Sequence, residues 1–335
     1  LVQHSLDIQG ISNGKKAIDG IPAVISSLPI MMEESYLTSV YGNNKLGSIA
    51  STLKENNYTT AFFHGGYNGT MGFDNFTRKV GYDYYYGMNE YNNKKDYDGN
   101  WGIFDEPFLQ YSVKQIDTLT KPFHAAFFTL SSHHPYAMPE EHKNKFSKGT
   151  LIVHETVSYT DYALKRFFNE ASKCDWFENT LFLITSDHSG LTESKDFKTQ
   201  LGLFKIPMII YHPKMKSNIV STQFVQQIDV YPTIIDMLNI ENEKIFTFGR
   251  SPFSEKEKYY IYYTNGEYLL MIGNYLSKYK QDGTIELFDV EKDQTLKNNI
   301  ANQQQEITKK HIRFTQAFIQ QYNNTIIENT TTISK

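Results

Sequence analysis

Two adjacent side chains, Asp187 and His188, are the strongest candidates for chemistry in this sequence. They follow the apolar run 181–185 and precede Ser-Gly, in the stretch Leu-Phe-Leu-Ile-Thr-Ser-Asp-His-Ser-Gly. A carboxylate oxygen and an imidazole nitrogen side by side are good ligands for a divalent metal such as zinc or manganese. The alternative is that the aspartate begins a turn and the histidine merely caps a strand. Recurrence of the same pattern on other strands favours the metal site.

Polar residues follow three other short apolar runs in the same way. The four runs are 59–63, 124–130, 181–185 and 206–211, and their continuous rather than alternating character predicts buried parallel strands. The histidines that come directly after them, five of the ten in the chain, are His64, His133, His134, His188 and His212. If the strands share one parallel sheet, their carboxyl ends meet at one edge, where these side chains would converge.

Helical patterns between these strands complete an α/β alternation. Helices are predicted over 47–57, before the Asp-His strand near 157–171, and from Asp229 to Leu238. This alternation predicts a doubly wound sheet in a domain covering residues 1–244.

The pattern changes near residue 245. Strand-like runs joined by Asn265-Gly266 and by Asp-Gly at 282–283 predict an antiparallel meander. A helix striped by Ile307, His311, Phe314 and Phe318 follows. We therefore predict a β-meander and helix subdomain over 245–322 and a loose tail over 323–335.

Composition excludes several classes of protein. The chain has 335 residues, of which 40% are hydrophobic, and a formal charge of −4 without a basic stripe, so nucleic acid is not an expected partner. The single cysteine, Cys174, rules out an internal disulfide and a cysteine-rich metal site. No run approaches the roughly 20 apolar residues that span a membrane. Because the sequence begins with Leu1 rather than Met, it is interpreted as a fragment or a mature piece.

A glycine-containing loop near the start, Ser12-Asn-Gly-Lys-Lys-Ala17-Ile-Asp19, runs into a predicted helix. Free backbone N–H groups and the helix dipole favour anions at such a position. Lys15 and Lys16 add positive charge. Alone, this loop is a weak signal.

Together, these motifs resemble the lipoteichoic acid synthase-like, phosphoglycerol-transferase branch of the sulfatase/alkaline phosphatase superfamily. The resemblance covers about residues 1–300. Its motifs are the loop and helix 12–29, Ser-Ser-His-His-Pro-Tyr at 131–136, Ser-Asp-His at 186–188, and the peripheral stretches 62–65, 227–233 and 287–293. It implies an alkaline-phosphatase-like fold with a doubly wound, mainly parallel sheet.

The resemblance also implies roles for particular residues. In this family a Thr or Ser at the helix N-terminus is both nucleophile and metal ligand, which corresponds to Ala17 here. Asp187 and His188 would be metal ligands, and His133 and His64 would contact substrate. One divalent metal is implied, manganese by the family's expectation, with zinc, calcium and magnesium as alternatives.

Ala17 is the main departure from the family pattern, because a methyl group can neither bind a metal nor attack an ester. The protein is then a natural pseudoenzyme, or carries an engineered substitution, or the register is shifted and Ser12 is the nucleophile. The shifted register ranks last, since Asp19 and Pro22 also match the family pattern.

A second departure concerns the beginning of the chain. The family's first strand, with its acidic metal ligand, and the membrane-spanning helices before it are expected upstream of Leu1. The resemblance therefore implies a position on the extracytoplasmic face of a bacterial cell membrane, with the anchor outside this sequence.

The substrate is expected to differ from glycerol phosphate. Met71 and Phe73 stand where the synthases place a Trp and an Arg, so a bidentate phosphate clamp is lost. We predict a metal-dependent hydrolase or transferase acting on phosphate or sulfate esters of envelope glycans or lipid head groups. The alternative is a catalytically inactive binding module of the same fold. A related mutase would need a second Asp/His metal cluster, which we cannot assemble.

Of the other histidines, His124 and His212 are interpreted as structural, and His134 as either a pocket group or a support for the Pro135 turn.

Overall fold

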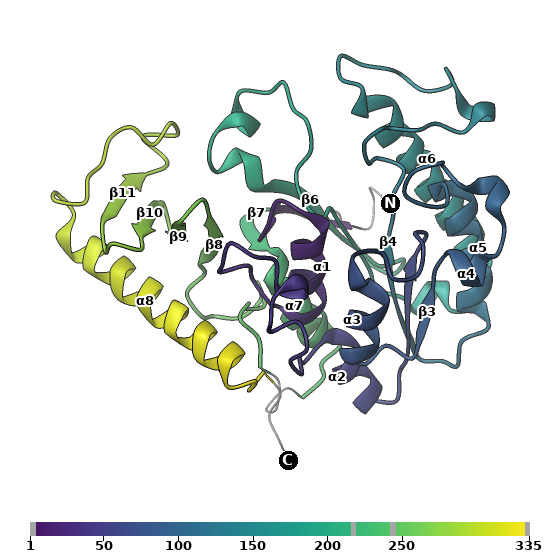
Figure 1. Cartoon of the computed structure of the whole chain (residues 1–335), viewed down its shortest axis with the longest axis horizontal. Coiled ribbons are helices and arrows are strands. Elements are labelled where there is room, and N and C mark those ends of the chain that lie inside the picture. Colours follow the sequence, from purple (N-terminus) through teal and green to yellow (C-terminus); the bar gives the residue numbers. More distant parts are fainter. Residues whose placement is uncertain (1–4, 216–218, 242–245, 332–335) are drawn as a thin grey trace. The chain divides into compact units, whose positions relative to one another are not determined.

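The computed structural model describes residues 5–215, 219–241 and 246–331 and divides the chain into two compact units (Figure 1). Unit 1 contains Leu1–Ile49, Phe182–Tyr211 and Ser217–Lys335, and unit 2 contains Ala50–Leu181 and His212–Lys216. The predicted boundary at 244/245 falls in the stretch 242–245, outside the described residues.

Unit 1 is built on a four-stranded sheet with the order β5-β6-β1-β7. The strands are β1 (Ser5–Ile11), β5 (Phe182–Thr185), β6 (Lys205–Tyr211) and β7 (Ile219–Gln226). β7 is parallel to β1, whereas β6 is antiparallel to both β1 and β5. The prediction that 206–211 is a parallel strand was therefore wrong in direction, although a strand was correctly predicted there, with its start one residue late.

Helices α1 (Ala17–Ser26) and α7 (Val230–Met237) belong to the same unit and contact each other. α1 is apolar on nearly every side and is correspondingly buried, with Ile21, Ala23 and Ile25 inside the core. It ends where Ser27 adopts a left-handed φ of 54° and the N–H of Leu28 donates to the carbonyl of Pro22 at 3.3 Å.

The predicted meander is confirmed as a second sheet of unit 1. Its strands β8 (Tyr260–Thr264), β9 (Glu267–Ile272), β10 (Tyr275–Lys280) and β11 (Ile285–Asp289) pair antiparallel with their chain neighbours. The hairpin between β8 and β9 turns at Asn265 and Gly266, whose φ values of 51° and 79° suit a two-residue hairpin turn.

Helix α8 (Gln305–Ile327) packs on β9, β10 and β11 (Figure 1). The helix extends beyond residue 323, where the sequence predicted a loose tail, and Ile326 is buried. On the strands, Tyr262, Leu269 and Leu276 belong to a core cluster that also contains Ile11 and Phe204.

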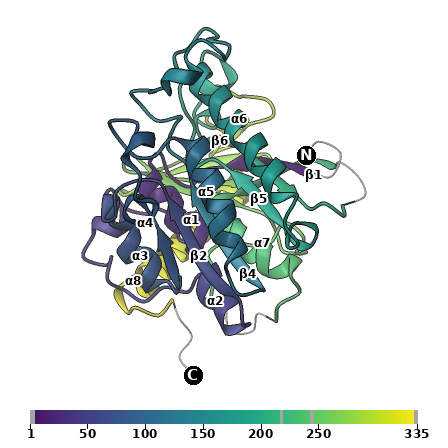
Figure 2. The same cartoon turned by 90° about the vertical axis from the view of Figure 1, so that its right-hand side faces the viewer.

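Unit 2 has a parallel sheet with the order β3-β2-β4. Its strands are β2 (Thr59–His64), β3 (Tyr84–Tyr86) and β4 (Phe123–Phe128). α2 (Ile49–Glu55) precedes these strands, and the helices between and after them are α3 (Phe73–Lys79), α4 (Met88–Tyr91), α5 (Asp105–Asp117) and α6 (Val153–Ala171). α5 and α6 pack against each other (Figure 2). Parallel strands alternating with helices confirm the predicted α/β class. Among the helices of the described residues, none combines the length and the apolarity needed to cross a membrane.

Candidate active site

Asp187 and His188 lie in unit 1, just after the last residue of β5. The His188 N–H donates to Asp187 Oδ1 at 2.9 Å, and His188 Nδ1 is 2.8 Å from the Ser189 carbonyl. A carbonyl only accepts, so Nδ1 carries a proton, and Nε2 is the nitrogen that can bind a cation when the ring is neutral. Nε2 lies 3.4 Å from Asp187 Oδ2, and both side chains are partly exposed.

This separation suits two ligands of one cation. Ligands about 2.1 Å from a tetrahedral metal lie about 3.4 Å apart. The backbone carbonyl on Nδ1 is also the usual support for a metal-binding histidine. Within residues 5–215, 219–241 and 246–331, no group of three or more His, Cys, Asp or Glu side chains could hold a metal. The described residues therefore offer two ligands that fit and not a full coordination shell.

Ala17 is the first residue of α1, as the loop motif predicted, and is 8% exposed. The first turn of α1 packs directly on the Asp-His turn, because a Cβ on Gly20 would lie 2.7 Å from the Asp187 carbonyl oxygen. The start of α1 and Asp187 therefore meet within unit 1. Ser12, the alternative nucleophile, is fully buried, and its hydroxyl donates to the Phe204 carbonyl at 3.3 Å.

A buried amide network holds this arrangement. The Gln227 side chain donates to the carbonyls of Ser186 at 2.9 Å and Asp187 at 2.7 Å, and it accepts the Asn13 N–H at 2.9 Å. Asn13 Oδ1 in turn accepts the Ile228 N–H at 3.0 Å. Asn13 and Gln227 are both 0% exposed. These bonds fix the loop before α1, the turn after β5 and the start of α7 to one another.

Asp19 completes the polar surroundings of α1. Its Oδ1 accepts the Ser35 hydroxyl at 2.6 Å, and its side chain lies against Gly14. Burial raises the pKa of Asp19, while the Ser35 hydrogen bond and the charges of Lys16 and His188 act in the opposite direction. Asp19 is therefore within electrostatic range of His188.

His64 ends β2 in unit 2 and is only 1% exposed. Its Nδ1 is 2.9 Å from the Tyr85 hydroxyl, and Phe73 packs edge-on against its ring at 5.4 Å. Burial lowers the pKa of His64 to about 4, so the ring is neutral at physiological pH. Its predicted contact with substrate stays a prediction.

His133 lies in the loop after β4, at the same edge of the parallel sheet as His64. Its exposed ring lies 4.3 Å from the Trp101 ring, between centroids, and Trp101 Nε1 donates to the His134 carbonyl at 2.7 Å. The buried Asp105 carboxylate anchors this loop by accepting the N–H groups of Leu130 at 2.8 Å and Ser131 at 3.1 Å. A bridge between Gly66 and Gly102 joins the loop that carries Trp101 to the loop after β2.

Sequence reasoning missed the supporting residues of both units. From the sequence, no role was assigned to Trp101 or Asp105, and Gln227 was given only as part of a peripheral motif. Asp105 bonds to residues 25 and 26 positions away, and Gln227 to residues 40, 41 and 214 positions away. Such contacts leave no local periodicity. The partial signal was that Gln227 stands in a motif shared with the family.

The predicted convergence of five histidines requires a correction at His212. Because β6 is antiparallel to β5, its last residue Tyr211 pairs with Phe182, the first residue of β5. Asp187 follows the opposite end of β5. His212 therefore follows β6 at the end of the sheet away from the Asp187–His188 pair. The predicted meeting of His133 and His64 with the groups of unit 1 stays a prediction.

Solved structures define the class of fold. A protein in the alkaline phosphatase superfamily from Vibrio parahaemolyticus matches with a TM-score of 0.83 at 20% identity, covering 100% of this chain and 81% of that one. The lipoteichoic acid synthase LtaP from Listeria monocytogenes matches with a TM-score of 0.77 at 17% identity, covering 100% and 86%. The fold is therefore that of the alkaline phosphatase superfamily, as predicted.

Sequence comparison places the chain within that class. The sulfatase family model matches residues 9–240, and the chain belongs to this family. Lipoteichoic acid synthase 1 of Bacillus subtilis (strain 168) is 28% identical over 246 residues, which are 68% of this chain and 38% of that protein. Lipoteichoic acid synthase 2 of the same strain is 28% identical over 275 residues, 73% of this chain and 41% of that protein. The chain thus spans well under half the length of these relatives, and the predicted resemblance is confirmed.

Replacing Gly20 with alanine tests the contact between α1 and the Asp-His turn. Alanine normally stabilises a helix interior by about 0.5–1 kcal/mol over glycine. Here we expect the opposite, a loss of about 1–3 kcal/mol in the free energy of unfolding measured in urea, because the new Cβ would overlap backbone. Gly190→Ala is the control, since nothing lies within 4 Å of its added Cβ. Equal stability of the two variants would contradict the close packing.

Replacing Gln227 with leucine tests the amide network. The change leaves the Ser186 and Asp187 carbonyls and the Asn13 N–H without this partner. At about 1–3 kcal/mol for each unsatisfied buried group, we expect a loss of at least about 2 kcal/mol in unfolding free energy. Gln227→Glu, which keeps the acceptor for Asn13 but loses both donors, should also destabilise. If the Leu variant were as stable as the parent, the hydrogen bonds of Gln227 would not contribute to the free energy of unfolding.

Proposed function

We propose that this protein provides a one-metal site for phosphate or sulfate esters carried by envelope glycans or lipid head groups. The observation that carries the proposal is the Asp187–His188 pair, whose facing ligand atoms lie 3.4 Å apart beside the first turn of α1. Membership of the sulfatase family supports ester chemistry. Manganese is the proposed metal, with zinc, calcium or magnesium as alternatives.

Asp187 Oδ2 and His188 Nε2 would hold the cation, which when bound would neutralise negative charge on the ester oxygens. The Gln227 bonds keep both ligands in position. His133 is exposed and suited to hold a phosphate or sulfate oxygen or to protonate a leaving alcohol. The buried Phe73, packed on His64, stands where the synthases are expected to place an arginine, and this favours a substrate other than glycerol phosphate.

The proposed setting is the extracytoplasmic face of a bacterial membrane. The named relatives are lipoteichoic acid synthases, and lipoteichoic acid is an envelope polymer. Membrane attachment would come from a region of the natural protein that this sequence does not include.

Ala17 favours a second candidate, a binding module that has lost catalysis. The nucleophile position holds a methyl group at the start of α1, and the Ser12 hydroxyl is sealed in the core against the Phe204 carbonyl. In this candidate the same residues bind metal and ester without turnover. The two candidates differ only in whether the bound ester is cleaved.

Metal titration tests the proposed ligands. We expect His188→Ala and Asp187→Asn each to weaken Mn²⁺ binding, measured by calorimetry, by at least about tenfold, because each removes one of few protein ligands. His212→Ala is the matched control, since His212 follows a strand of opposite direction. Weakening by the His212 change, with the His188 variant unaffected, would refute the assignment.

Restoring a hydroxyl at position 17 separates the two candidates. In the longest natural form of the chain, with Mn²⁺, we expect Ala17→Ser or Ala17→Thr to raise hydrolysis of bis-p-nitrophenyl phosphate or p-nitrophenyl sulfate by at least about 100-fold. This result would mark the parent as a disabled enzyme. Turnover by the unaltered chain at the same rate would show that another residue is the nucleophile. Metal binding without turnover in any form would favour the binding module.

A further inference from the structure

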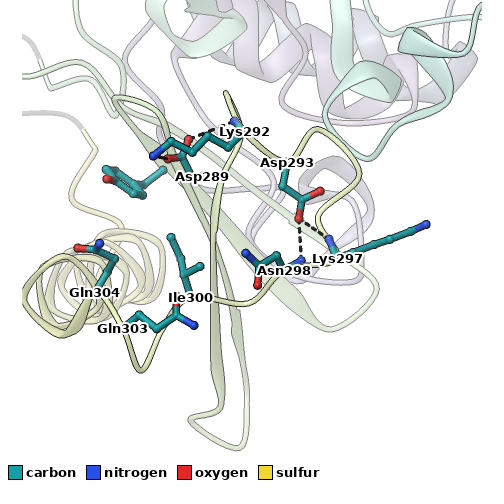
Figure 3. Close-up of a pocket in the computed structure, with 9 residues that line it drawn as sticks. Asp289, Lys292, Asp293, Lys297, Asn298, Ile300, Gln303 and Gln304 are labelled. Carbon is teal, nitrogen blue, oxygen red and sulfur yellow. Dashed lines mark hydrogen bonds and ion pairs between the residues drawn. The ribbon is translucent and has the colours of Figure 1, made fainter.

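Two hollows of about 590 Å³ each adjoin at the meander and the first turns of α8, and Tyr275 lines both. One is bordered by the loop after β11 and by Gln303 and Gln304 (Figure 3). The other is bordered by the turn between β9 and β10 and by Ile307 and His311. Because Tyr275 lines both, the two hollows are treated together and called the Tyr275 groove. Each is of small-molecule size.

The loop after β11 is fixed through its backbone. The Asp293 carboxylate accepts the N–H groups of Lys297 at 2.6 Å and Asn298 at 2.7 Å. Directly beyond, the Ile300 N–H donates to the Leu287 carbonyl of β11 at 2.8 Å. The backbone on both sides of Asn298 is thus held by hydrogen bonds, so this part of the loop need not be ordered when a ligand binds.

Three amide side chains line the groove, on Asn298, Gln303 and Gln304. The backbone N–H groups of Gln303 and Gln304 both bond to the Ile300 carbonyl at 2.9 Å. Among the described residues, no partner is recorded for any of the three side-chain amides. Each can donate and accept hydrogen bonds. A ligand rich in hydroxyl groups matches this chemistry.

Most of the charged groups that line the groove have hydrogen-bond or ion-pair partners. Lys292 forms an ion pair with Asp289 at 3.0 Å, and Lys310 with Glu257 at 2.5 Å. Lys258 donates to two backbone carbonyls at 2.8 and 2.7 Å. Lys297 also lines the groove without an ion pair among the described residues, but its side chain extends away from the other labelled residues (Figure 3). Of the described lysines that line the groove, none is therefore both unpaired and directed toward the other labelled groups, as recognition of phosphate, sulfate or carboxylate requires.

We propose that the Tyr275 groove binds a neutral oligosaccharide. The Tyr275 ring, shared by both hollows, would pack against the apolar face of a sugar, as Ile307 would in the second hollow. The free amides would bond to sugar hydroxyls on either side. No residue proposed for the ester site lines the groove, so this binding is independent of the metal and of Ala17.

Calorimetric titration with defined sugars tests the proposal. The probes are cellohexaose, chitohexaose and maltohexaose, which are uncharged or carry only neutral N-acetyl groups, and a heparin hexasaccharide as the anionic comparison. We expect at least one neutral probe to bind, with the same affinity in EDTA, and to bind more tightly than heparin. Combining Asn298→Ala with Gln303→Ala should weaken binding at least about tenfold, because two hydrogen-bonding amides are lost.

Asn302→Ala is the matched control, an exposed amide one residue from Gln303 that does not line the groove, and should change affinity by less than about twofold. Tyr275→Ala should abolish binding. If that variant unfolds, the double amide variant tests the proposal instead, because both of its substitutions are at exposed positions. Failure of every neutral probe to bind, tighter binding of heparin, or unchanged affinity in the double amide variant would each overturn the proposal. None of these results bears on the ester site.

Discussion

The hydrogen bonds of Asn13 and Gln227 connect parts of the chain separated by 214 residues, and the candidate site depends on them. Both side chains are fully buried, so each bond they lose would leave an unsatisfied polar group in the core. The loop before α1, the turn with Asp187 and the start of α7 are therefore positioned as one body. Asn13 Nδ2 extends the connection to the Ile261 carbonyl of β8 at 2.9 Å, so the meander is tied to the same network.

The sequence correctly predicted features that depend on residues close together in the chain. Strand-like runs joined by the Asn265-Gly266 turn and the Asp-Gly turn at 282–283 located the meander, and apolar runs ending in polar residues located β2, β4 and β5. The direction of β6 could not be predicted, because its apolar run is the same in either direction, and only its pairing with β1 and β5 decides. Gln227 and Asp105 escaped notice because their partners are remote in sequence.

The two histidines predicted to contact substrate differ in burial, although each follows a strand of the same parallel sheet. His133 is exposed on a loop held by Asp105 and Trp101, where it is available to a ligand. His64 has the same place at the end of a parallel strand, yet its ring is enclosed by Tyr85, Phe73 and Phe128. The sequence pattern identified the sheet edge on which both lie, but the side-chain environment depends on aromatic residues far along the chain.

The discontinuity of unit 1 has a consequence for how the chain reaches its native state. Unit 2 is nearly one uninterrupted stretch, from Ala50 to Leu181, and its parallel sheet can close as soon as β4 has been synthesised. β1 leaves the ribosome before its neighbours β6 and β7, which follow roughly 200 residues later. Both edges of β1 therefore stay open to mispairing until the second half of the chain arrives. Long-range pairing of this kind slows the closure of unit 1 relative to that of unit 2.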